Sequence, residues 1–340
     1  MDLNAIWFAV LGLLLAGYAV LDGFDLGVGI LHPMTRRDSE RRAFINVIGP
    51  IWDGNEVWLV VFGGALFAAF PMAYATVFSA FYLPFMALLF ALILRAASIE
   101  FRGKMPSERL RRACDWGFFA SSLLASLLFG VGVGNTVIGL PLDERGVFAG
   151  RLVDLLSPYA LGVGALTAAM FAMHGAVYLH LRLHEGPLQA RVRRALWFAW
   201  GAFLVAYAVM TTVTLLFVPT ATANFARHPW AWGVVALNVL AVLNVPRAVR
   251  ANRPLQAFAS SALTILALVG LLGLALWPNL VGASNAPELS LDIYRAASSP
   301  KTLRVMLVFV AIGMPFVLVY TGIVYWTFRA RVKEEEHEGY

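Results

Sequence analysis

The sequence has little charge and almost no cysteine, and both shortages restrict what the chain can be. Charged residues make up 14% of the 340 residues, whereas hydrophobic residues make up 60%. A soluble domain usually carries about 25% charged residues, so this composition excludes an ordinary soluble fold. The one cysteine, Cys114, excludes an internal disulfide and a cysteine-based metal cluster. The composition therefore predicts an all-α polytopic membrane protein.

Long apolar runs fill most of the chain and predict how often it crosses the membrane. A transmembrane helix needs about 20 consecutive apolar residues. Pro71 is expected to divide the long apolar field of residues 50–100 into two helices. The runs predict a single transmembrane domain, residues 1–340, with nine transmembrane helices. We expect them near residues 6–31, 50–71, 75–100, 116–136, 156–181, 195–217, 229–248, 257–277 and 303–328.

Basic residues are distributed unevenly between the two sides, and this predicts the orientation of the chain. Segments after the odd-numbered helices hold 20 of the 26 Lys and Arg residues. Cytoplasmic loops of membrane proteins carry an excess of these residues. The N-terminus is therefore expected outside and the C-terminus in the cytoplasm. The same rule accounts for the net charge of +6 without any binding of nucleic acid.

Ionisable residues occur inside the first three predicted helices, where each costs about 2.5–3.5 kcal/mol at the bilayer centre. Asp22 and Asp25 are three residues apart, so they share one helix face. The rise per residue places both at a depth similar to that of Asp53, Glu56 and Arg95, in the cytoplasmic half. Four acids face one arginine, so water, protonation or a partner must compensate them. The pattern predicts a proton path or a contact with a partner's cofactor, with a purely structural polar network as the alternative.

Histidines that could hold a haem are scarce. A b-type haem in a membrane protein is usually held by histidines on bundle helices. His174 lies in mid-membrane, and His180, six residues further on, does not share its face. We therefore expect His174 to be hydrogen-bonded to a neighbour and no haem to be bound by ligands of this chain. No phosphate-binding loop, zincin motif or nucleophile triad occurs, so the sequence predicts no catalytic residue and no metal site here.

Three stretches of the sequence resemble a known family. They are LDGFDLGVG (21–29), IGPIWDGNEVWLVVFGGALFAAFP (48–71) and AASSPKTLRVMLVFVAIGMPFVLVYTGIVYWTFRAR (296–331). With the FRGK end of the third helix, they are similar to subunit II of the cytochrome bd-type quinol oxidases, including the cyanide-insensitive oxidase subunit II group. The resemblance covers nearly the whole chain. It implies two four-helix bundles plus one extra helix.

The resemblance implies a terminal oxidase of the respiratory chain that oxidises quinol and reduces dioxygen to water at the bacterial plasma (inner) membrane. In that family subunit I carries the haem catalytic centre, with two b-type haems and usually haem d. Subunit II is haem-free and supports subunit I. The expected partners are subunit I, quinol, dioxygen, protons and membrane lipids. The sequence leaves open whether small accessory subunits join, and whether a structural quinone or lipid binds in this chain.

The resemblance also gives roles to charged residues at the inner side of the membrane. In the family, the acids that match Asp22, Asp25 and Asp53 belong to a hydrophilic proton path from the cytoplasm toward the haems of subunit I. Arg95 and Glu100 match the arginine and the acid at the end of the third helix. We therefore expect these five residues, together with Glu56, to form a proton pathway.

Three further residues receive expectations from the same comparison. Trp58 matches a tryptophan near the mouth of a hydrophobic oxygen channel. Trp52 and Asp53 match residues that some members place close to haem propionates of the partner. Glu56 departs from the pattern, because the enteric enzymes have Gln at this position. Its charge would add to an already acidic proton pathway.

The residues alone also allow a free-standing proton-coupled membrane transporter or a purely structural scaffold. Transporters often repeat a pair of interrupted helices that meet at the membrane midplane. Here the acids lie toward one side, and no matching acidic motif recurs in the fifth to eighth helices. The sequence therefore favours the subunit of a quinol oxidase.

Overall fold

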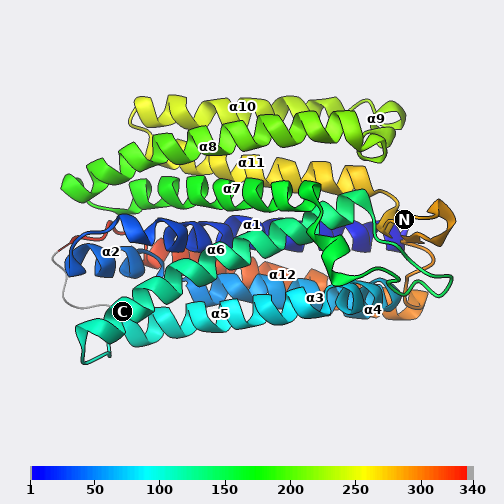
Figure 1. The fold of residues 1–340 in the computed structure, drawn as a ribbon, viewed down its shortest axis with the longest axis horizontal. Helices are drawn as coiled ribbons and strands as arrows, with labels where there is room; N and C mark the ends of the chain where they lie inside the picture. The colour runs from blue at the N-terminus through cyan, green and yellow to red at the C-terminus, as the bar shows by residue number, and fades with distance from the viewer. Residues whose placement is uncertain (1, 335–340) are drawn as a thin grey trace.

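Long helices lie side by side along one axis, and short elements cover the two ends of the bundle, as the computed structural model shows (Figure 1). The structure describes residues 2–334, so Met1 and residues 335–340 of the expected domain lie outside it. The long helices are α1 (Leu3–Leu31), α3 (Trp52–Ala69), α5 (Tyr82–Arg102), α6 (Glu108–Ile138), α7 (Pro158–Arg182), α8 (Pro187–Phe217), α10 (Ala231–Arg250), α11 (Pro254–Leu276) and α12 (Pro300–Thr327). The short elements are η1 (His32–Met34), α2 (Asp38–Ile48), α4 (Pro71–Ala80), η2 (Leu152–Leu156), η3 (Pro219–Ala221), α9 (Ala223–Arg227), η4 (Pro287–Leu289) and the antiparallel pair β1 (Asn279–Val281) and β2 (Leu291–Asp292).

Eight helices within residues 2–334 are long and apolar enough to cross a membrane. Among the long helices, α3 falls short of this criterion. Its first two turns carry polar residues: Asp53, Asn55 and Glu56. The all-helical polytopic membrane fold is confirmed, whereas the count of nine spans and the orientation of the termini stay predictions.

The region between residues 50 and 102 differs from the expectation. Residues 71–80 form the separate helix α4, so the third long helix begins at Tyr82 instead of near residue 75. Phe70 leaves the helical region at φ −137° and ψ 67°, and Phe81 interrupts the helix again before α5. Pro71 then starts α4, because the first turn of a helix does not need its missing N–H. The proline therefore begins a short helix of its own at the point where the sequence predicts the division between two long helices.

The long helices form two sets with one helix outside them. Helices α1, α3, α5 and α6 pack around one another, and α7, α8, α10 and α11 form the second set. The sets meet where α7 contacts α1 and α6, and α12 lies against α1 and α3. Figure 1 shows α8 and α10 on one side of the bundle and α5 on the other.

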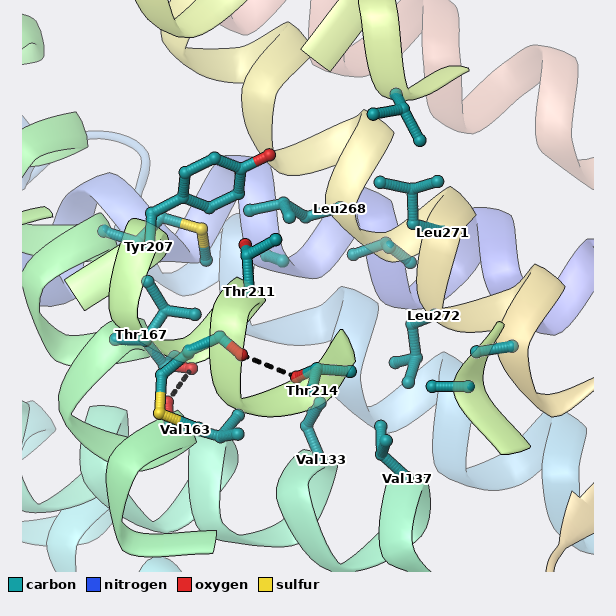
Figure 2. Close-up of a pocket in the computed structure, with 18 of the residues that line it drawn as sticks. Val133, Val137, Val163, Thr167, Tyr207, Thr211, Thr214, Leu268, Leu271 and Leu272 are labelled. Carbon is teal, nitrogen blue, oxygen red and sulfur yellow. Dashed lines mark hydrogen bonds between the residues drawn. The ribbon is translucent and has the colours of Figure 1, made fainter. Parts of the chain in front are cut away.

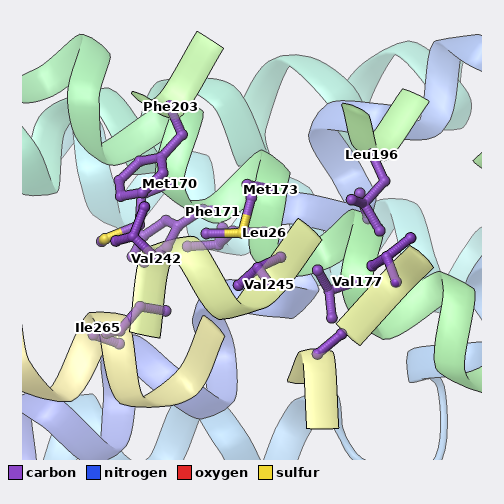
Figure 3. Close-up of a cluster of buried hydrophobic side chains, with 14 of the residues drawn as sticks. Leu26, Met170, Phe171, Met173, Val177, Leu196, Phe203, Val242, Val245 and Ile265 are labelled. Carbon is purple, nitrogen blue, oxygen red and sulfur yellow. The ribbon is translucent and has the colours of Figure 1, made fainter. Parts of the chain in front are cut away.

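A buried apolar cluster joins α1 to α7, α8, α10 and α11 (Figure 3). Lipid tails are as apolar as these side chains, so close packing holds the helices together. At Gly27 an added Cβ would overlap the carbonyl oxygen of Phe171, so this glycine lets α1 and α7 approach closely. The labelled members of the cluster are Leu26, Met170, Phe171, Met173, Val177, Leu196, Phe203, Val242, Val245 and Ile265.

A proline inside α10 is matched by a side chain from α8. Pro246 has no N–H, so it cannot donate to the carbonyl oxygen of Val242 one turn earlier. The indole Nε1 of Trp200 donates to that oxygen at 3.1 Å instead. Freed backbone groups within a membrane need such partners, and the pair therefore keeps α10 intact.

The two ends of the chain are tied to opposite ends of the bundle. The hydroxyl of Tyr294, in the loop before α12, donates to Asp2 at 2.6 Å. After α12, residues 328–334 form a segment that we name the C-terminal strap. Its Val332 exchanges backbone hydrogen bonds with the end of α7, donating to Arg182 at 2.8 Å and accepting from His184 at 3.0 Å. The strap therefore holds the C-terminal end of α12 in place.

Candidate functional site

Helices α1, α3 and α5 bring three of the predicted residues into direct contact. Nη2 of Arg95 donates to Oδ1 of Asp22 at 2.7 Å and also pairs with the carboxylate of Glu56. The side chains of Asp22 and Arg95 are completely buried, and that of Glu56 keeps 24% of its surface exposed. One guanidinium from α5 therefore links an acid on α1 with an acid on α3.

Asp25 lies one helical turn further along α1 and is also fully buried. Its Oδ2 accepts a hydrogen bond of 2.7 Å from Nδ2 of Asn55. The same nitrogen donates to the carbonyl oxygen of Leu21 at 3.2 Å, and Oδ1 of Asn55 accepts from the hydroxyl of Tyr325 at 2.9 Å. Asp25 thus has an amide partner but no direct ion pair within residues 2–334.

Several buried polar atoms of this cluster have no hydrogen-bond partner among the described residues. Buried polar groups in proteins nearly always have a partner, and internal water supplies one where the protein does not. Unpartnered atoms that gather in one place therefore leave hydrogen-bonding capacity for internal water. They are Oη of Tyr18, Oδ2 of Asp22, Oδ1 of Asp25, and Nε and Nη1 of Arg95.

Two predicted acids lie outside this buried cluster. Asp53 is in the first turn of α3, and its side chain is exposed. Glu100 lies near the end of α5, where it pairs with Lys104 at 3.9 Å. The structure therefore gathers Asp22, Asp25, Glu56 and Arg95 and keeps Asp53 and Glu100 at its edges.

Both predicted tryptophans pack inside the chain. Trp52 is 6% exposed and belongs to a buried cluster at the inner end of the bundle. Trp58 is 9% exposed and lies against Gly17 of α1, where an added Cβ would overlap its ring. The close contact between Gly17 and Trp58 holds α3 against α1 and so sets the position of the acids on both helices.

A second group of charged residues lies where the C-terminal ends of α1 and α5 meet the start of α6, and it was not predicted from the sequence. Asp115 accepts from Nε of Arg102 at 2.6 Å and from Nη1 of Arg41 at 3.1 Å, and it contacts Nε2 of His32 at 2.7 Å. Arg102 also donates to Asp38 of α2 at 2.7 Å. One signal was available, because Asp115 is an acid within a strongly basic segment that opens a membrane helix.

Two acids of α2 at this end of the bundle, outside the membrane-spanning segments, are stabilised in their ionised form. Burial alone would raise the pKa of Asp38, but the Arg102 and Arg42 guanidinium groups hold it below its usual range. Burial likewise opposes ionisation of Glu40, yet Arg191 and the backbone N–H groups of the preceding turn lower its pKa. These pairs tie α2 to its neighbours at this end of the bundle.

His174 has partners for both of its ring nitrogens. Nδ1 is 2.8 Å from the hydroxyl of Ser261, and Nε2 is 3.0 Å from the carbonyl oxygen of Val20. The ring stacks on Phe258 with an interplanar angle of 9°. Residues 2–334 contain no group of three or more His, Cys, Asp or Glu side chains that could hold a metal ion. With both nitrogens engaged, His174 does not fit the role of a haem ligand.

A cavity of about 370 Å³ lies on the other side of α1, between α7, α8 and α11 (Figure 2). Its walls are mostly apolar, and several of its hydroxyl groups already have partners. Thr167 donates to the carbonyl oxygen of Val163 at 2.9 Å, and Tyr207 donates to Asn238 at 2.7 Å. The cavity reaches Tyr18, one turn before Asp22, and so approaches the cluster of acids.

Comparisons with known proteins match the whole length of the chain. The family described as "Cytochrome bd terminal oxidase subunit II" matches residues 3–328. "Cytochrome bd-I ubiquinol oxidase subunit 2" of Escherichia coli (strain K12) is 35% identical, with 99% of this chain and 97% of the relative covered. "Cytochrome bd ubiquinol oxidase subunit 2" of Bacillus subtilis (strain 168) is 31% identical, with 98% of each covered.

A solved structure has a similar fold. "The structure of bd oxidase from Geobacillus thermodenitrificans" includes a chain that matches with a TM-score of 0.78 and 17% identity. The match covers 96% of this chain and 99% of that chain. At this identity the likeness shows the fold alone, and it agrees with the helical architecture described above. The multi-pass location in the bacterial inner membrane is confirmed by the apolar helices together with these relatives. The resemblance found in the sequence is therefore confirmed, and the chain belongs to the cytochrome bd terminal oxidase subunit II family.

Proposed function

We propose that this chain is the haem-free subunit II of a quinol:dioxygen oxidoreductase and conducts protons from the cytoplasm toward subunit I. The observation that supports this proposal is the cluster of Asp22, Asp25, Glu56 and Arg95, in which Arg95 pairs with two of the three acids and Asp25 has only an amide partner. The haem centre and the oxidation of quinol belong to subunit I in this proposal. This chain contributes a path along which protons reach that centre.

An excess of buried carboxyl groups favours conduction over a purely structural network. Arg95 compensates Asp22 and Glu56, whereas Asp25 receives only the amide of Asn55. A buried carboxylate without a cation is expensive, so a proton that arrives at Asp25 is readily accepted. Water at the unpartnered atoms of Arg95, Asp22 and Asp25 would connect these groups.

The exposure of the side chains gives the path a direction. Asp53 is exposed in the first turn of α3. Glu56 lies three residues further, next to Asp53 on the helix surface, and is partly exposed. Asp22 and Asp25 are completely buried. We propose the order Asp53, Glu56, Asp22 and Asp25 for an incoming proton, with Arg95 holding the middle of the path. Glu100 and its partner Lys104 lie near the inner end of α5, where their charges affect the electrostatic potential at the entrance of the proposed path.

The polar start of α3 also supports a partner on this side of the bundle. Asp53 and Gly54 are exposed at a depth where lipid tolerates acids poorly. Exposed apolar residues on α3 and the adjacent α12 continue the same surface. We propose that subunit I covers it, with Asp53 closest to its haem groups and Trp52 and Trp58 holding α3 in place. Exposed members of this surface are Val57, Val60, Val61, Phe309, Phe316 and Val319.

The cavity beside α7, α8 and α11 is our proposed site for an apolar molecule. A volume of about 370 Å³ falls in the range of small-molecule pockets, and the walls suit a lipid chain or the isoprenoid chain of a quinone. Organic extraction of the purified complex, followed by mass spectrometry, would identify an occupant. Thr211 lines the cavity, so Thr211→Trp or Thr211→Phe should reduce the amount of the bound molecule that is recovered.

Two substitutions test the proton path. Asp25→Asn and Asp53→Asn should each slow quinol-dependent oxygen uptake by at least about tenfold, because a proton-accepting group is lost. The haem spectrum of the purified complex should stay unchanged, which shows assembly. Glu108→Gln is the matched control, since Glu108 is exposed at the inner side and pairs only with Arg112. Unchanged turnover in both test variants would refute the path.

Purification separates this proposal from a proton-coupled transporter. A red-brown complex that contains haem and a second subunit supports an oxidase. A colourless protein that purifies alone would support a transporter.

A further inference from the structure

Helix α12 lies outside both sets of helices and is exposed along most of its length, with Leu303 as its buried residue. Near the inner end, however, Tyr325 turns toward α3. Its hydroxyl donates a hydrogen bond of 2.9 Å to Oδ1 of Asn55. This contact joins α12, at the edge of the bundle, to the buried cluster of acids.

Asn55 has its orientation determined from three sides. Its Nδ2 donates to Oδ2 of Asp25 at 2.7 Å and to the carbonyl oxygen of Leu21 at 3.2 Å. The hydroxyl of Tyr325 supplies the donor that Oδ1 requires. A flipped amide would turn Oδ1 toward Asp25 and Leu21, which offer a carboxylate and a carbonyl oxygen. The bond from Tyr325 therefore favours the orientation in which Asn55 donates to Asp25.

We propose that Tyr325 is a positioning residue for proton transfer, which acts through Asn55 and directs the proton to Oδ1 of Asp25. The role rests on the proposed proton path. Oδ2 of Asp25 is occupied by the amide donor, whereas Oδ1 is buried and has no partner among residues 2–334. An incoming proton therefore binds Oδ1 and leaves from the same atom. The O–H bond of a hydrated proton in the path breaks as the Oδ1–H bond forms, and the Oδ1–H bond breaks as the proton passes to the next water molecule.

The surroundings of Asp25 determine what a test must control. The charged and titratable groups that influence Asp25 come from several helices. They are Asp22 on α1, Glu56 on α3, Arg95 on α5, Tyr178 on α7 and Tyr325 on α12. Replacing Tyr325 by Phe leaves the other four groups unchanged and removes one hydrogen bond. This makes Tyr325→Phe a narrower perturbation than any change to the acids.

The test uses Tyr325→Phe in the complete oxidase complex, with Tyr320→Phe as the matched control. Tyr320 is on the same helix and 67% exposed. The Tyr325 variant should assemble with a normal haem spectrum, lose turnover several-fold and shift the acid limb of its pH–activity profile upward by about one pH unit, because Asp25 loses an oriented donor. The control should keep the profile of the parent complex.

Two further measurements separate positioning from simple packing of α12. Asn55→Leu should shift the profile in the same direction, and adding Tyr325→Phe to it should cause no additional shift. Infrared difference spectra should show the carboxylic C=O band of Asp25, assigned by its loss in Asp25→Asn, at a changed frequency in Tyr325→Phe. A structural role alone would lower assembly and leave both the profile and the band unmoved.

The outcomes distinguish this role from the proposed path. If Asp25→Asn slows turnover while Tyr325→Phe keeps the profile and band of the parent, the positioning role is wrong and the path stands. If Asp25→Asn and Asp53→Asn both leave turnover unchanged, the path fails and the role fails with it. A shifted profile with a shifted band, absent from Tyr320→Phe, supports the role.

Discussion

Arg95 is the residue on which the stability of the buried cluster should depend most strongly. Its guanidinium pairs with Asp22 at 2.7 Å and with Glu56, and its own side chain is completely buried. Arg95→Gln would leave two carboxylates without their cation. Breaking a buried ion pair by removing one partner costs about 3–5 kcal/mol, which is two to three and a half powers of ten in the unfolding equilibrium. We expect a loss of this size at pH 7.

The pH dependence of that loss has a definite sign. In the variant, the two carboxyl groups can escape repulsion by taking up protons. Protons are taken up more readily as the pH falls, so the penalty for the missing cation falls with the pH. The destabilisation should shrink between pH 7 and pH 5.

Reversible unfolding in mixed detergent micelles measures this difference at both pH values. Lys104→Gln is the matched control, since Lys104 is 69% exposed and its pair with Glu100 is 3.9 Å long. Such an exposed pair contributes about 0–1 kcal/mol. The neutral triple variant Arg95→Gln, Asp22→Asn, Glu56→Gln should recover most of the lost stability. A loss that is no larger than that of the control, or that does not change with pH, would contradict this reasoning.

Three further predictions concern other parts of the molecule. Gly27→Val should prevent close contact of α1 with α7 and abolish recovery of the folded complex, while Gly12→Val, at an open position, should be tolerated; yield from membranes decides. Trp200→Phe should cost about 1–3 kcal/mol in detergent unfolding, because the Val242 carbonyl loses its donor; equal stability would show that this bond contributes nothing. The pKa of Glu40 is lowered from 4.5 in the folded protein, so its ionised form stabilises the fold above that pH. The stability gap between the parent and Glu40→Gln should therefore be full at pH 7 and close as the pH falls below about 4.5, and a gap that widens in acid would be evidence against it.

Depth along the membrane could be predicted from the sequence, and rotation about each helix axis was harder to predict. The rise per residue placed Asp22, Glu56 and Arg95 at similar heights, and the structure brings them into contact. Glu100 lies five residues after Arg95, which turns it by about 140° to another face of α5. Helical geometry therefore explains why Glu100 lies outside the cluster.

Contacts between distant segments could not be predicted at all. Tyr325 meets Asn55 across 270 positions of sequence, and His32 meets Asp115 across 83. Neither contact follows from hydrophobic period or charge, because both depend on which helices become neighbours in the bundle. The helix α4 was missed for a local reason. Phe70 and Phe81 carry no breaking signal, although both leave the helical conformation there.

Because of the C-terminal strap, folding of this chain depends on the order in which its segments are synthesised. Residues 328–334 leave the ribosome after α12, yet Val332 pairs with the end of α7, and Glu334 accepts from Ser39 of α2 at 3.0 Å. The contacts of α2 and α7 with the strap can therefore form only after α12 has been synthesised. A nascent chain released before Phe328 would contain all the acids of the cluster but would lack the C-terminal strap that holds α12, and with it Tyr325, in place.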